Sequence, residues 1–149
     1  MNTTRSDVRL ANEAWEAVMT SHARLTRLFG TEKMWGEVSM REYDVLYTLA
    51  KAGEPLRIGE VQQGVLVSQP ALSRLVDRLV DRGLLARETD PDDARAVRIS
   101  LTEQGAELQR QVGRVHARSV TRELNAALTE TEMRELRRIA GKLAAGAPD

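Results

Sequence analysis

Apolar residues recur along most of the chain at three- and four-residue intervals, which is the spacing that buries one face of a helix. Capping signals mark where two of these stretches begin, because Ser39 is followed three residues later by Glu42 and Thr129 by Glu132. Gly53 is placed to end the helix that follows Ser39. The pattern predicts helices over residues 7–29, 40–52, 56–63, 68–82, 103–127 and 130–144.

Two short segments instead alternate apolar and polar residues with a period of two, which is typical of strands. They read LLARET and AVRISL. The intervening DPDDA favours a turn, because proline and clustered aspartates stabilise tight changes of chain direction. We therefore predict a two-stranded hairpin directly after the helix over 68–82.

The helix over 68–82 has one apolar and one polar face. Ser68 is a favourable N-cap, and Pro70 is tolerated in the first turn because its missing N–H would have no partner within the helix. Leucine and valine side chains line the inner face, whereas Gln69, Ser73 and Arg74 lie on the outer face. One face is predicted to pack and the other to remain free for binding.

These elements predict a mainly α fold, with six helices and a small β wing, in a single domain over 1–149. A short helix, a second helix with a free polar face and a charged hairpin form a winged helix-turn-helix lobe over 39–101, an arrangement that reads DNA. The helices over 7–29 and 103–144 carry more apolar surface than this lobe can cover. We therefore predict a homodimer formed through the N- and C-terminal helices.

Composition narrows the classes of function. The 149 residues are 42% hydrophobic and 30% charged, which is in the range of soluble globular proteins. The chain has no cysteine, which excludes disulfides, thiolate metal sites and a cysteine redox switch. No apolar run approaches the ~18 residues of a spanning helix, and the N-terminus lacks the apolar core of a signal peptide. We expect a cytoplasmic protein with no membrane partner.

The net charge is zero, with 22 basic and 22 acidic residues, unlike proteins that bind nucleic acid without sequence preference. Basic and acidic residues are also balanced within the segment 68–98. DNA binding must therefore depend on where the arginines lie rather than on total charge. The alternative is a homologue that has lost DNA binding and acts as a ligand-binding or scaffolding protein.

Two motifs suggest a family. The first reads LRIGEVQQGVLVSQPALSRLVDRLVDRGLL, and the second reads DDARAVRISLT. They resemble the helix-turn-helix and the wing signature of the MarR family of bacterial transcription regulators, and the resemblance extends over nearly the whole chain. Asp93, Arg95, Leu101 and Thr102 occupy the signature positions, while Leu66 stands where many helix-turn-helix sequences have glycine.

The resemblance implies a homodimer that binds a pseudo-palindromic operator in double-stranded DNA, and a repressor that a small effector releases. The first turns of the recognition helix meet base edges, where Gln69 can pair with adenine and Arg74 with guanine, each worth about 1–3 kcal/mol of discrimination. Arg95 beside the wing turn suits a narrow minor groove, and Asp93 is expected to hold an arginine in order. The candidate DNA-binding residues are Ser68, Gln69, Pro70, Ser73, Arg74, Arg78, Arg87, Arg95 and Arg98.

The sequence argues against metal and enzyme sites. The aspartates of the hairpin turn suggest a calcium loop, but an EF-hand needs other residue types where the chain has Ala94, Arg95 and Leu101. The two histidines are far apart in sequence, and no phosphate-binding loop or nucleophile elbow is present. We predict no metal, no cofactor and no enzymatic activity.

The resemblance also implies a small, often aromatic and acidic effector, bound between the dimerisation helices and the DNA-reading lobe. The candidate pocket comprises Trp15, Met19, His22, Trp35, Tyr43 and Tyr47, which are grouped in the first two predicted helices and the segment between them. Ordinary core packing is the alternative for these residues, and His22 is either a carboxylate ligand or a core histidine. His116, on the long helix over 103–127, is expected to be exposed.

We further expect an effector to act by shifting the spacing of the two recognition helices, so that effector and DNA oppose each other. The helix ends around Gly83 and Gly105 are the predicted hinges of this movement.

Overall fold

A computed structural model describes residues 5–146, which form six helices and a small sheet. The helices are α1 (Arg5–Gly30), α2 (Met40–Ala52), α3 (Ile58–Gln62), α4 (Gln69–Asp81), α5 (Glu103–Ala127) and α6 (Glu130–Ala145). The strands are β1 (Leu56–Arg57), β2 (Leu85–Thr89) and β3 (Val97–Leu101). The mainly helical fold with a small β wing is therefore confirmed.

The wing is an antiparallel hairpin of β2 and β3, in which Leu85 lies opposite Leu101 and Thr89 opposite Val97. The sheet has a third strand that the sequence does not predict, because β1 pairs with β3 on its other side in the order β1-β3-β2. A strand of two residues is too short to produce an alternating pattern, so the periodicity predicts Leu56 as part of the helix that follows it. The edge contact with β3 decides its conformation.

The predicted capping residues define the ends of α2 and α4. Ser39 and Glu42 form the capping box at the start of α2, and Gly53 ends the helix in the left-handed conformation at φ 69°. The Ser68 hydroxyl accepts a hydrogen bond from the Ala71 amide, 3.3 Å away, at the start of α4. Gly83 takes a positive φ of 73° just after α4, where the chain turns into β2.

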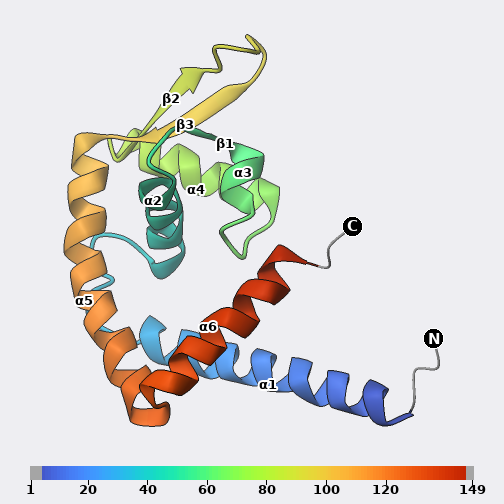
Figure 1. Cartoon of the computed structure of the whole chain (residues 1–149). Coiled ribbons are helices and arrows are strands. Elements are labelled where there is room, and N and C mark those ends of the chain that lie inside the picture. Colours follow the sequence, from blue (N-terminus) through green and yellow to red (C-terminus); the bar gives the residue numbers. More distant parts are fainter. Residues whose placement is uncertain (1–4, 147–149) are drawn as a thin grey trace.

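The hydrophobic core lies within the lobe formed by α2, α3, α4, the sheet and the first half of α5. Leu72, Leu75, Val76 and Leu79 are all buried on the inner face of α4, as the periodicity predicts. Figure 1 shows this lobe at one end of α5, with the hairpin projecting beyond it. Packing in this core therefore fixes the position of α4 relative to the wing.

The long helices α1 and α6 lie at the end of α5 that is far from the wing (Figure 1). None of the residues of α6 is buried. On α1 and α6 the large apolar side chains that remain exposed are Val8, Leu10, Trp15, Val18, Met19, Leu136, Ile139 and Leu143. No helix of residues 5–146 is long and apolar enough to span a membrane.

Candidate nucleic-acid interface

The outer face of α4 carries the predicted base-reading side chains. Ser68, Gln69, Pro70 and Arg74 are exposed in the first two turns, whereas Ser73 is half-buried beside the wing. The helix N-terminus is therefore open to solvent, with side chains that can donate to base edges or phosphates. Its geometry is compatible with insertion into a major groove.

Three arginines on this side of the lobe have no carboxylate partner among residues 5–146. Arg74 and Arg78 lie on the outer face of α4, and Arg95 lies beside the hairpin turn. All three are exposed, and none forms an ion pair within the described part of the chain. These side chains carry positive charge that is available to a phosphate or a base without breaking an internal contact.

The two remaining arginines of the predicted interface are already paired. Arg87 on β2 binds Asp77 on α4, so that this ion pair connects the recognition helix to the wing. Arg98 on β3 donates to the Glu88 carboxylate at 2.8 Å, directly across the hairpin. The sequence predicts all five arginines as DNA contacts, but it does not reveal this division between paired and unpaired side chains.

The hairpin turn is held by Asp90, a residue for which the sequence pattern predicts only a place in the turn. Its carboxylate is only 7% exposed and accepts from Arg57 Nε at 2.8 Å and from the amide of Asp92 at 2.8 Å. These hydrogen bonds hold the pKa of the Asp90 carboxyl down to about 2. The Asp90-Pro91 pair is the sequence signal for such a turn, but Arg57 lies too far away along the chain to be recognised as its partner.

Asp93 makes a more local contact than the predicted pairing with an arginine side chain. Its carboxylate accepts a hydrogen bond from the backbone amide of Arg95 at 3.0 Å, and no arginine side chain binds it in the described chain. The contact orders the backbone of the turn and so sets where the Arg95 side chain begins. The arginine that a carboxylate of this turn does hold is Arg57, bound by Asp90.

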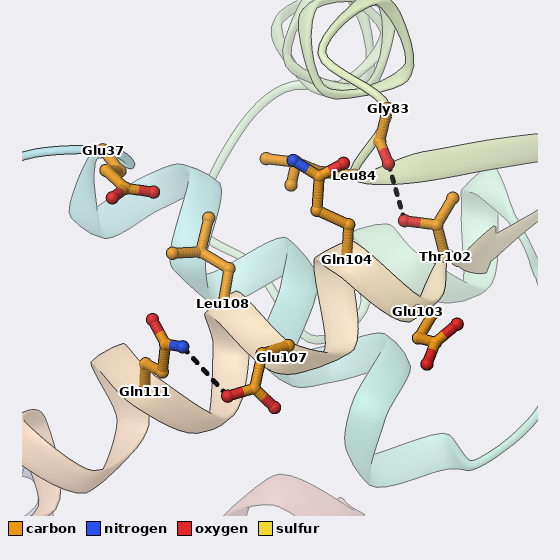
Figure 2. A pocket seen from close by; sticks show the side chains of 9 residues that line it. All are labelled: Glu37, Gly83, Leu84, Thr102, Glu103, Gln104, Glu107, Leu108 and Gln111. Atoms are coloured by element: carbon orange, nitrogen blue, oxygen red, sulfur yellow. Dashed lines mark hydrogen bonds between the residues drawn. The ribbon is translucent and has the colours of Figure 1, made fainter.

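The start of α5 is packed tightly against Gly83 and Leu84, in the turn that follows α4 (Figure 2). The Thr102 hydroxyl donates to the Gly83 carbonyl at 2.6 Å and accepts from the Gly105 amide at 3.0 Å. A Cβ added to Gly105 would stand 2.0 Å from the Leu84 carbonyl oxygen, so only glycine allows this approach. Gly105 therefore lies at a close backbone contact, which links the lobe to α5 and is a poor place for the hinge that the sequence suggests.

A hollow of ≈ 660 Å³ lies beside this junction, lined by the acidic side chains of Glu37, Glu103 and Glu107 (Figure 2). Its charge opposes an anionic ligand, and the Glu107 carboxylate is already held by Arg110 and Gln111. The predicted effector residues do not line this hollow.

The prediction that His116 is exposed is wrong. Its ring is half-buried on α5 between three aromatic rings, with centroid distances of 5.2 Å to Phe29, 5.4 Å to Trp35 and 5.7 Å to Tyr43. Its Nδ1 is buried without a hydrogen-bond partner in the described chain, and burial lowers the pKa of the ring. The flanking arginines suggested an exposed segment, but position 116 faces the junction of α1 and α2.

Two hollows meet at His116. The larger, of ≈ 790 Å³, lies between α2 and α5 and is lined by Tyr43 and Tyr47. The smaller, of ≈ 290 Å³, is lined by His22 of α1 and by the turn between α3 and α4. Asp44 and His116 contribute to both hollows, and desolvation raises the pKa of the Asp44 carboxyl.

The predicted effector residues are thus divided among three environments. Tyr43 and Tyr47 line the larger hollow, and His22 lines the smaller one. Trp35 packs against Tyr43 with a centroid distance of 5.6 Å, and its indole donates to the Phe29 carbonyl at 2.7 Å. Trp15 and Met19 line neither hollow and are exposed on α1. The structure therefore assembles part of the predicted pocket and separates these two residues from it.

Comparison with known proteins identifies relatives for most of the chain. Residues 37–96 match the model of the MarR family. An uncharacterised HTH-type transcriptional regulator of Mycobacterium bovis is 33% identical over 132 residues, covering 89% of this chain and 88% of that protein. The HTH-type transcriptional regulator PecS of Dickeya dadantii is 30% identical over 109 residues, 72% of this chain; the match spans only 65% of PecS, less than two thirds.

Solved structures share the fold. AbsC, a MarR family transcriptional regulator from Streptomyces coelicolor, superimposes with a TM-score of 0.74 at 24% identity, covering 98% of this chain and 99% of that chain. A mutant MarR from E. coli complexed with operator DNA gives a TM-score of 0.72 at 24% identity, covering 86% of this chain and 91% of that one. BpsR of Bordetella bronchiseptica is a protein whose DNA binding is regulated by 6-hydroxynicotinic acid. It superimposes with a TM-score of 0.74 at 21% identity, covering 89% of this chain and 93% of that chain.

Proposed function

The chain belongs to the MarR family of transcriptional regulators, and from this premise we propose that it is a sequence-specific reader of double-stranded DNA that acts as a repressor. The observation that carries the proposal is the position of Arg74, Arg78 and Arg95, which lie exposed on α4 and at the wing tip and form no ion pair with any described residue. A lobe in which every arginine formed an internal ion pair would have much less positive charge available to bind phosphates. The family supplies the class of function, and these residues supply its contacts.

In the proposed complex, α4 enters a major groove. Gln69 and Arg74 read base edges, Pro70 and Ser73 add less selective contacts, and Arg78 binds a phosphate one turn further along. The amide end of α4 with Ser68 holds a second phosphate. Arg95 enters the adjacent minor groove, where the negative potential is enhanced if the groove is narrow.

The proposed functional unit is a homodimer. The exposed apolar side chains of α1 and α6, which the lobe leaves uncovered, support this proposal because a second copy of the same surface buries them. Two recognition helices related by a two-fold axis then match an inverted repeat with half-sites about 10 bp apart.

An aromatic acid is the proposed effector, bound in the larger hollow between α2 and α5. Tyr43 and Tyr47 supply apolar ring faces there, and Arg114 lines the same hollow without an ion-pair partner among the described residues. BpsR provides a relative in fold whose DNA binding responds to a heteroaromatic acid. A ligand between these helices would tilt α5, and the tight junction at Gly105 would pass that tilt to α4.

The DNA proposal is tested by selecting bound sites from random duplexes and then measuring affinity by fluorescence anisotropy at several salt concentrations. Arg95→Ala should weaken binding by about 1–3 kcal/mol without changing the circular dichroism spectrum or the dimer. Arg118→Ala on α5 is the matched control, because that exposed arginine also lacks an ion pair in the described chain but lies away from the wing. Unchanged affinity of Arg95→Ala contradicts the wing assignment.

The effector proposal has its own test. Trp35, which packs beside Tyr43 and His116, serves as a fluorescent reporter for titration with benzoate and hydroxybenzoates. Binding should weaken about tenfold or more in Arg114→Ala, because one charge-assisted hydrogen bond to a carboxylate is worth roughly 1.5–3 kcal/mol. Equal affinity of the variant and the native protein would place the carboxylate elsewhere.

A ligand-binding or scaffolding homologue without DNA binding is the second candidate, favoured by the zero net charge. Failure to enrich any duplex from the random pool would support it, provided that the protein is folded and dimeric.

A further inference from the structure

Two acidic side chains lie within the proposed DNA-binding face, where they would repel phosphates. Asp77 is on α4 next to Arg78, and Glu88 is on β2 next to Arg87. Both are exposed, so neither is required to fill the core. Their partners are the paired arginines of the wing: Asp77 binds Arg87, and Glu88 binds Arg98 at 2.8 Å.

The positions of these two acidic residues show which arginines are neutralised in a segment whose net charge is zero. Among the described residues, the arginines on the outer face of α4 and at the wing tip have no acidic partner, whereas those along the strands are neutralised. Charge is thus available on α4, where sequence is read and Arg78 reaches a phosphate, and at the wing tip, where groove shape is read; it is cancelled along the strands, where only the phosphate backbone would be contacted.

We propose that Asp77 and Glu88 are specificity-determining residues that take the place of phosphates in the free protein: they occupy Arg87 and Arg98 and thereby weaken binding to non-specific DNA. This inference rests on the proposed function, since it assumes that this face meets a duplex. Asp77 and Glu88 do not touch bases; they act through the arginines that they hold.

The physical reason is an exchange of partners. Non-specific affinity comes from arginines and lysines that neutralise phosphates and release condensed counterions. An arginine that leaves a carboxylate to meet a phosphate gains one anion and loses another, and the abandoned carboxylate then lies near the negatively charged backbone. At the correct site the base contacts of Gln69 and Arg74 are added, so the acids reduce non-specific binding more than specific binding.

Exposed ion pairs of this kind are weak, which makes the exchange reversible and the test practicable. Asp77→Asn and Glu88→Gln remove the negative charge while keeping the shape of each side chain. Both variants should fold, because neither residue is buried.

The experiment measures affinity for a selected operator and for a random-sequence duplex between 50 and 300 mM salt. For Asp77→Asn we expect several-fold tighter binding to the random duplex and a smaller ratio of specific to non-specific affinity. The slope of log affinity against log salt should steepen by about 0.9 for each arginine released to a phosphate. Glu88→Gln should act in the same direction through Arg98.

Two controls separate this role from a structural one. Glu135→Gln frees Arg138 on α6, away from the wing, and should leave both the salt slope and the specificity ratio unchanged. In Asp77→Asn combined with Arg87→Ala, the gain in non-specific affinity should disappear, because the released arginine is gone. Melting temperatures report any loss of stability independently.

An unchanged salt slope in Asp77→Asn, with native protein that binds its operator, overturns the inference and leaves the proposed function intact. Weaker binding together with a lower melting temperature also overturns it, because the ion pair then serves only to hold the wing. If the native protein binds no duplex at all, it is the proposed function that has failed.

Discussion

The winged lobe and the terminal helices α1 and α6 carry apolar faces of the same helical periodicity, yet the fold treats them differently. In the lobe, Leu72 and Leu79 are fully buried, at 0% exposure. On α6, Leu136 is 50%, Ile139 45% and Leu143 66% exposed. An amphipathic pattern therefore indicates that one face of a helix packs against another surface. It does not indicate whether that surface belongs to the same chain or to a second one.

The difference implies two sources of stability. The lobe is held by contacts within one chain, which do not depend on protein concentration. The helices α1 and α6, called the arms below, bury their apolar faces only on association, so their stability varies with protein concentration in the proposed dimer. Perturbing one region should therefore leave a different signature from perturbing the other.

The largest expected effect comes from placing charge on the arms. In the double variant Leu136→Arg and Ile139→Arg, sedimentation should show a monomer at micromolar concentration, because two charges would be buried without partners. Operator affinity should fall about 100-fold or more, since two half-sites are no longer linked. The circular dichroism of the lobe should persist.

Arg134→Gln is the control for this double variant. It lies on the opposite side of α6, about 160° around the helix from Leu136 and about 140° from Ile139 at 100° per residue, and the dimer should survive. A monomeric native protein at the same concentration would refute the role assigned to the arms.

A smaller effect, opposite in sign between the two regions, is expected from adding one methyl group. Gly105→Ala should destabilise the protein by about 1–3 kcal/mol in urea denaturation, because the new Cβ meets the Leu84 carbonyl. Gly141→Ala on α6 has no atom within 4 Å of the added Cβ and should stabilise by roughly 0.5–1 kcal/mol. Equal effects at both positions would show that the junction relaxes easily.

The smallest expected effect is the pH dependence of the lobe. The Asp90 pKa of about 2 lies below the ~3.9 of an unfolded aspartate, so its stabilising contribution is complete above about pH 4 and is lost as the pH falls towards 2. Asp90→Asn should therefore be less stable than the native protein at pH 7, and the difference should shrink between pH 4 and 2.

Urea midpoints across this pH range measure the effect. Asp81→Asn, an exposed residue at the end of α4 without an ion pair in the described chain, provides the control and should show no such convergence. A constant difference between Asp90→Asn and the native protein from pH 7 to 2 would mean that the Arg57 contact adds nothing.

Much of the lobe, and the start of α6, was predictable from local chemistry. Ser39, Ser68, Thr102 and Thr129 each accept a hydrogen bond from an amide of the helix that they precede, which is a contact between residues three apart in sequence. The buried face of α4 follows from the same short-range geometry. The family resemblance depended on these segments for the same reason, since its motifs cover the helix-turn-helix and the wing.

The pairing of arginines was not predictable. Asp77 and Arg87 are ten residues apart and belong to different elements, and Arg57 meets Asp90 across 33 residues. Six basic and six acidic residues in the segment 68–98 permit many pairings, and only the register of β2 with β3 and the packing of α4 select among them. The five arginines of the candidate interface are thus divided into a free group and a paired group.

The sequence by itself determined where the capped helices α2, α4, α5 and α6 begin, where the wing lies and which face of α4 packs, because caps, turns and periodicity act over a few residues. The tertiary structure decided which charges are neutralised, that His116 lies among aromatic rings, that Leu56 and Arg57 form a strand, and that Trp15 and Met19 stand apart from the hollows. The physical reason is distance: ion pairing, ring packing and desolvation depend on separation in space, which only the packed chain defines.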